Sequence, residues 1–416
     1  MITTTGQTVL PERIRQLQVE IGSSAAMPAG GQLLRHAVFE FRYLEADNTQ
    51  PCVGLLMPAH TPTYQAGDLF PVMDQNLPEG DLFMRLRQMY PKQPFSAMHL
   101  LALAGSNGIG RLGFHLADHP APAVPATVSR QALLALRYTP VVFDDLVQAY
   151  LCTGAGIAGM QPKIMVPDRP TIPIPTLIVK AASDAYPGLA ANEFLCLSAA
   201  RRAGILTPGF DLSDDGQLLV IDRFDIDAQG HRLGFEDMAS LMGLRVRDVL
   251  SDRKYQGSYA RIADVLKMLR LPADNLARFF EQVAFTVMVR NGDGHLKNFG
   301  VLYQDETDIR LAPMFDVVTT AIYRYTRYSG GPALEGQTMA LKLFGGRHQS
   351  RAYPTLDALL RFGREVCGVT QPAQVLRRLA QGMAEALQAA PTDPRLPVQA
   401  VAAMAEFWRL GMAYAE

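Results

Sequence analysis

A glycine-rich loop near the middle of the chain restricts the fold more strongly than any other segment. Gly154, Gly156 and Gly159 have the G-x-G-x-x-G spacing that dinucleotide-binding folds place between a strand and a helix. Pro162 and the apolar run at 164–166 follow the loop and favour a strand instead. This context excludes a dinucleotide-binding fold. It leaves two interpretations with equal weight: a simple turn, and a loop that covers nucleotide phosphates ahead of a strand.

The expected elements divide the chain into a β-rich half and a helical half. Two apolar runs within 36–57 predict a β-hairpin, and the closely spaced prolines of 116–127 predict an extended connection. Residues 128–152 have a helical pattern, strands and loops follow them, and helices dominate after Phe235. We therefore expect an α+β fold in three parts, with boundaries at 1–127, 128–235 and 236–416.

Composition excludes several classes of protein. The chain has 416 residues, of which 48% are hydrophobic, enough for more than one core. Its 39 Lys and Arg and 40 Asp and Glu give a net charge of -1, so no global field attracts nucleic acid or anionic lipid. The four cysteines form no C-x-x-C pair, which argues against a zinc knuckle and a disulfide scaffold. Without a recognisable secretory signal or apolar span, we expect a cytoplasmic protein that is not in a membrane.

A lysine ends the apolar strand predicted at 176–179. The Lys180 ammonium is costly at the end of a buried strand unless it meets an anion, and kinase-type sites place such a lysine on the α/β-phosphates. Taken alone, a lysine that reaches solvent is the simpler interpretation. Glu193 begins the amphipathic helix predicted at 192–204, where it would pair with Lys180 or favour the helix dipole.

The segment at 290–300, RNGDGHLKNFG, places polar side chains between an apolar helix and an apolar strand. Asp293 and Asn298 have the D-x-x-x-x-N spacing of a phosphotransferase catalytic loop, in which the Asp accepts a proton and the Asn binds magnesium. Asp316 follows a predicted strand and offers a second carboxylate. Because Mg²⁺ prefers oxygen ligands, Asn298 and Asp316 would complete its shell together with ATP phosphates and water.

His295 lies within this polar segment, so a metal hydrolase has to be considered as well. The 8 histidines are scattered and form no H-E-x-x-H pair, which excludes the usual zinc site. The chain also lacks a G-x-S-x-G nucleophile elbow. Phosphoryl transfer is therefore the chemistry that the segment favours.

Taken in order, the motifs of the chain resemble those of the HipA family, the serine/threonine kinase toxins of bacterial type II toxin–antitoxin systems. The resemblance extends from residue 36 to residue 345 and is most specific at D-G-H-x-K-N. The matching segments are 159–163, the strand ending at Lys180, 192–193, 222–225, 254–259, 291–298 and 311–316.

The resemblance implies the roles of individual residues. It implies that Asp293 is the catalytic base, with His295 and Lys297 in the same loop, and that Asn298 and Asp316 hold Mg²⁺. It implies an ATP site with a phosphate-side loop, a phosphate-binding lysine, its partner and an adenine hinge, namely Gly159, Gln161, Lys163, Lys180, Glu193, Asp222, Arg223 and Phe224.

The resemblance also implies a fold, a reaction and partners. The fold is a two-lobed, protein-kinase-like α+β fold with an N-terminal α/β subdomain, a β-rich ATP lobe and a helical catalytic lobe. The reaction is transfer of the ATP γ-phosphoryl group to a protein serine or threonine, with a translation factor or aminoacyl-tRNA synthetase as target and growth arrest and persistence as the result. The partner is a HipB-like helix-turn-helix antitoxin, through which alone the chain would contact DNA.

One departure concerns self-regulation. Family members carry a serine ahead of the G-x-Q-x-K motif whose autophosphorylation silences the kinase, but Gly156 stands at this position and Thr153 is the nearest upstream hydroxyl. Two other functions remain open: a small-molecule kinase of the aminoglycoside-phosphotransferase type, and a catalytically silent binding or repressor module.

Overall fold

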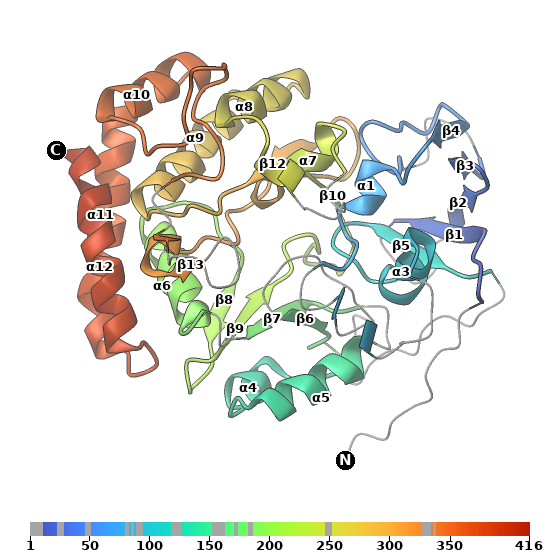
Figure 1. Ribbon diagram of the computed structural model, residues 1–416, viewed down its shortest axis with the longest axis horizontal. Coiled ribbons are helices and arrows are strands. Elements are labelled where there is room, and N and C mark those ends of the chain that lie inside the picture. Colours follow the sequence, from blue (N-terminus) through green and yellow to red (C-terminus); the bar gives the residue numbers. More distant parts are fainter. Residues whose placement is uncertain are drawn as a thin grey trace. The chain divides into compact units, whose positions relative to one another are not determined.

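The structure is a computed structural model that describes most of the chain. The described residues are 11–22, 29–45, 51–79, 83–84, 87–88, 95–117, 127–151, 163–169, 174–181, 186–245, 252–325, 334–335 and 338–416. They form two compact units, each discontinuous in sequence (Figure 1). The first contains Met1–Ala181, Val220–Arg253 and Val301–Ile309, and the second contains Ala182–Leu219, Lys254–Gly300 and Arg310–Glu416. This division does not delimit the three expected parts, 1–127, 128–235 and 236–416, which stay predictions.

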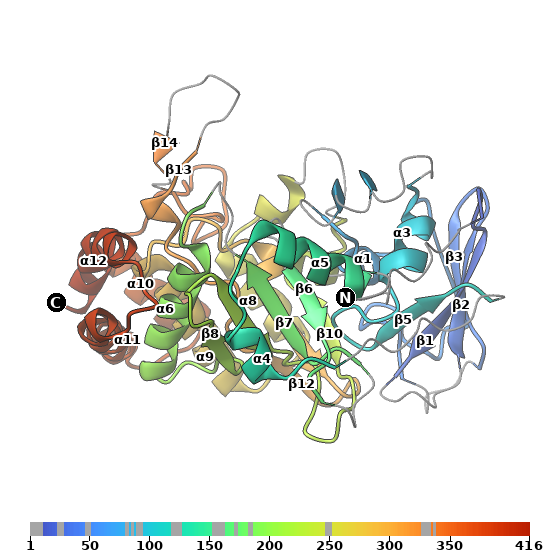
Figure 2. The ribbon, with the colours of Figure 1, turned by 90° about the horizontal axis from the view of Figure 1, so that it is seen from below.

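The N-terminal part of the first unit is an antiparallel five-stranded sheet with the order β4-β3-β2-β1-β5. Its strands are β1 (Gln16–Ile21), β2 (Ala29–Arg35), β3 (Phe39–Tyr43), β4 (Thr63–Ala66) and β5 (Leu112–His115). Leu17, Val19 and Phe41 are fully buried, as expected where side chains alternate between the two faces of a strand. Helix α3 (Ala97–Ala104) packs against β1 and β5 (Figure 2), and the short helix α1 (Pro71–Asp74) lies in the same unit.

The hairpin predicted within 36–57 is displaced in the structure. β2 and β3 pair Arg35 with Phe39, so the tight turn lies at 36–38 and the first strand precedes the predicted segment. The second apolar run, at 51–57, forms only an isolated bridge between Gly54 and Met57. This run contains proline and glycine, which weaken a strand because proline cannot donate to the ladder and glycine has no side chain to pack.

The other described strands form three smaller sheets, with the orders β6-β7-β9-β8, β10-β11-β12 and β13-β14. Their bounds are β6 (Lys163–Val166), β7 (Leu177–Ala181), β8 (Phe210–Leu212), β9 (Leu218–Asp222), β10 (Gly234–Asp237), β11 (Gly300–Tyr303), β12 (Ile309–Leu311), β13 (Arg324–Tyr325) and β14 (Leu334–Glu335). Strand β6 confirms the strand predicted after the glycine-rich loop. The loop itself lies outside the described residues, and helix α5 (Pro140–Leu151) precedes it, preceded in turn by α4 (Arg130–Leu134).

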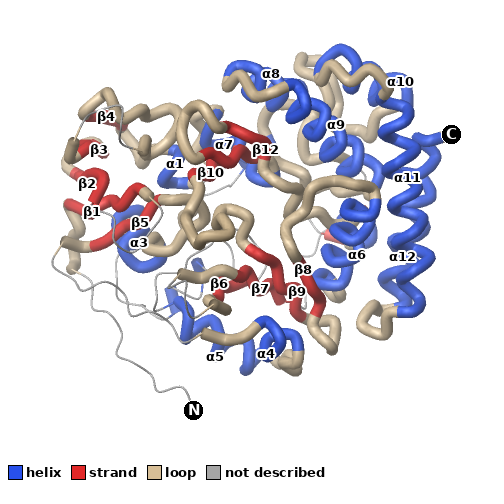
Figure 3. Tube along the Cα trace, turned by 180° about the vertical axis from the view of Figure 1, so that it is seen from behind, coloured by secondary structure: helices blue, strands red, loops and turns tan. Residues whose placement is uncertain are grey.

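Helices make up most of the second unit. Figures 1 and 3 show α11 and α12 side by side, and α11 also packs against α6 and α9. The close packing depends on Gly382, because a Cβ there would lie 2.6 Å from the Ala203 nitrogen on the α6 side. The helices of this unit are α6 (Leu189–Arg202), α8 (Tyr259–Met268), α9 (Ala273–Met288), α10 (Leu356–Arg361), α11 (Pro372–Ala389) and α12 (Val398–Met412). In the first unit, α7 (Met238–Leu241) follows β10 directly. None of the helices in the described ranges is long and apolar enough to cross a membrane.

A buried ion pair connects separate segments of the first unit. The Arg223 guanidinium donates to both Asp225 carboxylate oxygens, at 3.1 and 2.6 Å, and both side chains are almost completely inaccessible to solvent. Arg223 also donates to the carbonyls of Pro175 and Gly108, and the Gly110 amide donates to Asp225. The pair therefore connects the strand ends at 175 and 223 to the loop at 107–110.

We expect Asp225→Asn to destabilise the protein by about 3–5 kcal/mol, because it leaves the Arg223 charge buried without its counter-charge. Urea unfolding followed by circular dichroism measures the effect. The control is Asp274→Asn, which breaks an exposed pair with Arg278 and should cost less than about 1 kcal/mol. Equal midpoints for the two variants would contradict this role of the Arg223–Asp225 pair.

Candidate active site

The polar segment predicted as a catalytic loop joins α9 to β11 in the second unit. Helix α9 ends at Met288, and Arg290 has a left-handed backbone with a φ of 57° that turns the chain out of the helix. The Asn291 side-chain oxygen accepts from the Asp293 amide at 3.0 Å, and the Asn298 side-chain oxygen accepts from the His295 amide at 2.9 Å. The loop is therefore held by its own asparagines.

Two glycines allow the loop to fold this tightly. A Cβ on Gly292 would lie 2.7 Å from the Thr338 carbonyl oxygen, and one on Gly294 would lie 2.7 Å from a methyl carbon of Thr286. The Gly292 amide also donates to the Thr320 hydroxyl at 2.6 Å. Any larger side chain at either glycine would displace the loop from its neighbours.

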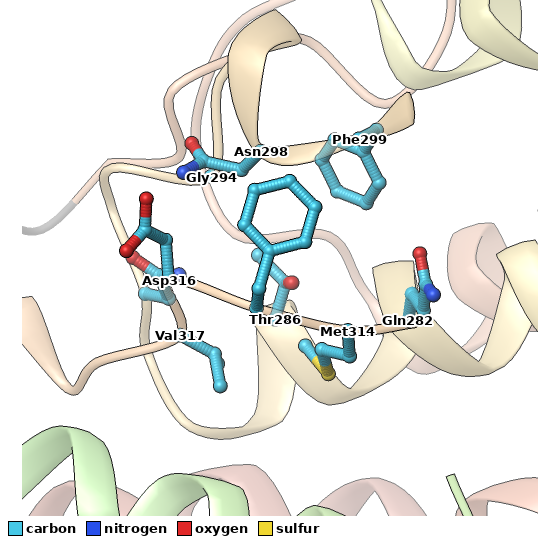
Figure 4. A pocket seen from close by; sticks show the side chains of 10 residues that line it. Gln282, Thr286, Gly294, Asn298, Phe299, Met314, Asp316 and Val317 are labelled. Atoms are coloured by element: carbon cyan, nitrogen blue, oxygen red, sulfur yellow. The ribbon is translucent and has the colours of Figure 1, made fainter. Parts of the chain in front are cut away.

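Asn298 and Asp316 line one small pocket of the second unit. Figure 4 shows the Asn298 amide and the Asp316 carboxylate turned toward each other at its edge, with Thr286, Phe299 and Met314 on the other walls. Asp316 has a left-handed backbone with a φ of 52°, a conformation that costs energy for a residue with a side chain. The structure thus brings together the two oxygen donors that were predicted to hold magnesium.

The segment after Asp316 is fixed by α6 and α12. Asn192 accepts from the Thr319 amide at 2.8 Å and donates to the Thr319 carbonyl at 3.1 Å, while the fully buried Trp408 indole donates to the Thr319 hydroxyl at 2.7 Å. Asn192 was noted in the sequence only as part of a motif, and nothing in the sequence indicated the contact of Trp408. Three side-chain hydrogen bonds therefore fix Thr319, which is three residues after Asp316 in the chain.

Asp293 is the exposed carboxylate of the loop, and Oδ1 accepts a hydrogen bond from the Tyr255 hydroxyl at 2.7 Å. His295, by contrast, is buried, and the edge of the Tyr255 ring meets it with centroids 5.2 Å apart. Burial lowers the pKa of His295 well below its ordinary value, and the charges of Lys254 and Lys297 lower it further. The imidazole is therefore neutral at pH 7, and its buried Nδ1 has no hydrogen-bond partner among the described residues.

Other predicted site residues lie in the first unit. Lys163 and Lys180 are direct partners in the β6–β7 ladder, and both are buried. Side chains of directly opposite residues lie on the same face of a sheet, and like charges there repel. The register of this strand pair therefore places the two predicted phosphate-binding lysines next to each other.

The residues predicted at the adenine hinge also belong to this unit. Asp222 accepts a hydrogen bond from Arg130, and the Phe224 ring meets Phe235 edge to face with centroids 5.5 Å apart. The side chain of Arg223 is committed to Asp225 and to backbone carbonyls. Contact with adenine by this segment stays a prediction, and it would involve the backbone rather than the Arg223 guanidinium.

Glu193 is buried in α6, which begins at Leu189, so it lies in the second turn and not at the helix start. The predicted interaction with the helix dipole is therefore wrong, because that effect is confined to the first turn. Gly159 and Gln161 lie outside the described residues, as do Thr153 and Gly156, the positions considered for self-silencing.

Comparison with known proteins identifies the family. A family model for the HipA-like C-terminal domain matches residues 155–390, and one for the HipA N-terminal domain matches residues 27–115. The first model alone covers more than half of the chain. The chain therefore belongs to the HipA family.

Solved structures agree on the fold. A chain from the Shewanella oneidensis MR-1 complex of HipA, HipB and operator DNA matches with a TM-score of 0.66 and 17% identity, over 96% of each chain. This likeness confirms the predicted α+β, HipA-like fold.

Curated relatives are putative kinases of Sinorhizobium fredii (strain NBRC 101917 / NGR234). Y4dM is 34% identical over 161 residues, which are 35% of this chain and 38% of Y4dM. Y4mE is 26% identical over 317 residues, which are 70% of this chain and 74% of Y4mE. The chain thus matches well under two thirds of the length of Y4dM.

We expect the burial of neutral His295 to make stability depend on pH. Because the unfolded histidine binds a proton below about pH 6.5 and the folded one does not, its contribution is fully present above that pH and is lost as the pH falls. The loss amounts to at most about 1.4 kcal/mol per pH unit. Denaturant unfolding between pH 7.5 and 5 should show this slope in the wild type and a smaller slope in His295→Gln; equal slopes would contradict a buried neutral imidazole.

Proposed function

We propose that the protein is an ATP-dependent protein kinase that transfers the γ-phosphoryl group to a serine or threonine. The observation that carries the proposal is the loop that joins α9 to β11. Within one short segment it presents an exposed carboxylate, Asp293, and a side-chain amide, Asn298, which lines the same small pocket as Asp316. This combination matches the base and the magnesium ligands of a phosphotransferase.

The donor set fits a hard divalent cation. Asn298 Oδ1 accepts one hydrogen bond, from the His295 amide, and a carbonyl oxygen has a second lone pair. Asn298 and Asp316 would hold Mg²⁺, which when bound neutralises charge on the β- and γ-phosphates. Lys163 and Lys180 would contact ATP phosphates, a role supported by their position opposite each other in the β6–β7 ladder.

In the reaction, Asp293 accepts the proton of the attacking hydroxyl. Its position on the exposed side of the loop is accessible to a protein substrate. The hydrogen bonds of Asn291 and Asn298 and the glycines of the loop keep the loop compact, so that the Asp293 carboxylate is held in one position. Catalysis then depends mainly on positioning and on charge neutralisation.

The substrate and partners follow from the family. The target class is a component of translation, such as a translation factor or an aminoacyl-tRNA synthetase, in the bacterial cytoplasm, and the result is growth arrest. The partner is a helix-turn-helix antitoxin, an inference supported by the HipA–HipB–operator complex of Shewanella oneidensis MR-1. A chain with a net charge of -1 has little affinity of its own for DNA, so the antitoxin makes the DNA contact.

Incubation with radiolabelled ATP, Mg²⁺ and either a bacterial protein extract or a set of aminoglycosides and sugars tests the reaction. We expect label on protein serine or threonine, and at least about 100-fold less of it with Asp293→Asn, because the base is lost. Glu406→Gln, an exposed carboxylate on α12, is the matched control and should retain full activity.

Two results would overturn the protein-kinase proposal. Label on small molecules alone would identify a small-molecule kinase. A wild type that is as inactive as Asp293→Asn, with both proteins folded, would indicate a silent binding module.

A gel-shift experiment tests the antitoxin partner. DNA from the protein's own gene region is mixed with this chain alone, with a short helix-turn-helix protein from a neighbouring reading frame where one is encoded, and with both proteins together. At physiological salt we expect no shift with this chain alone, a shift with the helix-turn-helix protein, and a larger complex when both proteins are present. A shift by this chain alone would contradict indirect DNA contact.

A further inference from the structure

A segment of the second unit whose role the proposed function leaves open contacts the catalytic loop at two points. The segment is 254–259, KYQGSY, which runs from the end of the short helix Asp252–Tyr255 to the first residue of α8. The Tyr255 hydroxyl donates to Asp293 Oδ1 at 2.7 Å, and the buried Tyr259 hydroxyl donates to the Gly294 carbonyl at 2.8 Å. Two tyrosines from one segment thus contact consecutive residues of the loop.

Tyr255 is itself held from several sides. Arg351 donates to its backbone carbonyl at 2.6 Å, which fixes the main chain. Its ring packs edge to face on His295 at an interplanar angle of 76°, and the Lys254 ammonium lies 5.5 Å from the ring centroid. The hydroxyl is therefore presented to Asp293 by a constrained side chain and not by a freely rotating one.

The chemistry of the contact differs from that of an ordinary structural hydrogen bond. Asp293 is exposed, so water could satisfy its carboxylate, and no buried polar group requires the tyrosine hydroxyl for that purpose. A hydroxyl donor on one carboxylate oxygen instead fixes the rotation of the group about its last torsion, which is otherwise broad. It also occupies only one of about four acceptor positions on the carboxylate.

We propose that Tyr255 is a positioning residue for phosphoryl transfer: its hydroxyl orients the Asp293 carboxylate toward the hydroxyl of the acceptor. The inference rests on the proposed function, since it takes Asp293 as the base. Tyr255 acts through Asp293 and forms no bond to substrate. Its ring has a second, purely structural role, the covering of buried His295.

The two roles separate in two variants. Tyr255→Phe keeps the ring on His295 and removes only the hydroxyl, whereas Tyr255→Ala removes both. We expect Tyr255→Phe to lower kcat by about 10- to 100-fold, the size of effect that a misplaced catalytic group has. The KM for ATP and the melting temperature should stay at the wild-type values. Tyr255→Ala should lower both kcat and the melting temperature.

The control is Tyr414→Phe, which removes a hydroxyl that donates to the Pro354 carbonyl, outside the loop. It should change neither kcat nor KM. A double variant makes the test sharper: because Tyr255 acts through the base, adding Tyr255→Phe to Asp293→Asn should lower the residual rate no further.

The outcomes distinguish this inference from the proposed function. If wild type transfers phosphate and Tyr255→Phe has the wild-type kcat, the positioning role is overturned while the kinase stands. If Tyr255→Phe raises the KM for ATP and leaves kcat unchanged, the residue serves nucleotide binding and the inference is also overturned. If wild type and Asp293→Asn are equally inactive, the proposed function fails and this inference fails with it.

Discussion

The hydrogen bond from the His295 amide to the Asn298 side-chain oxygen is the interaction on which the candidate site depends. At 2.9 Å it joins residues three positions apart in sequence and closes the loop after α9 into one compact turn. With the loop closed, Asn298 reaches the pocket shared with Asp316, and Asp293 remains on the exposed side. Gly292 and Gly294 are necessary for the same reason, because a Cβ would meet the Thr338 backbone at Gly292 and the Thr286 side chain at Gly294.

Closing the loop has a cost that other contacts offset. His295 is buried with an unpartnered nitrogen, and a buried polar atom without a hydrogen bond is unfavourable. Around it, Tyr259 ties the loop to the start of α8, while Asn192 and Trp408 fix the chain beyond Asp316. Strain and imperfect burial concentrated at one place, and surrounded by well-satisfied contacts, are typical of functional sites.

The sequence predicted the HipA-like fold, which is confirmed, whereas the roles of the site residues stay predictions. The D-x-x-x-x-N spacing pointed to Asp293 and Asn298 because both lie in one short loop, and short loops are set by local residues. The strand after the glycine-rich loop was also predicted correctly from local composition. The hairpin within 36–57 was displaced because strand pairing depends on register with distant partners, which short apolar runs do not specify. The contacts of Tyr255 and Trp408 join residues that the fold alone brings together, so no local pattern could have revealed them.

The most direct measurement of the central claim is a crystal structure with Mg²⁺ and a non-hydrolysable ATP analogue. The account predicts a metal ion about 2.0–2.1 Å from side-chain oxygens of both Asn298 and Asp316, with phosphate oxygens completing its shell. It also predicts that Asp293 is free of metal and faces the γ-phosphate. A nucleotide whose metal ion is bound by other residues, or one bound away from the loop between α9 and β11, would contradict it.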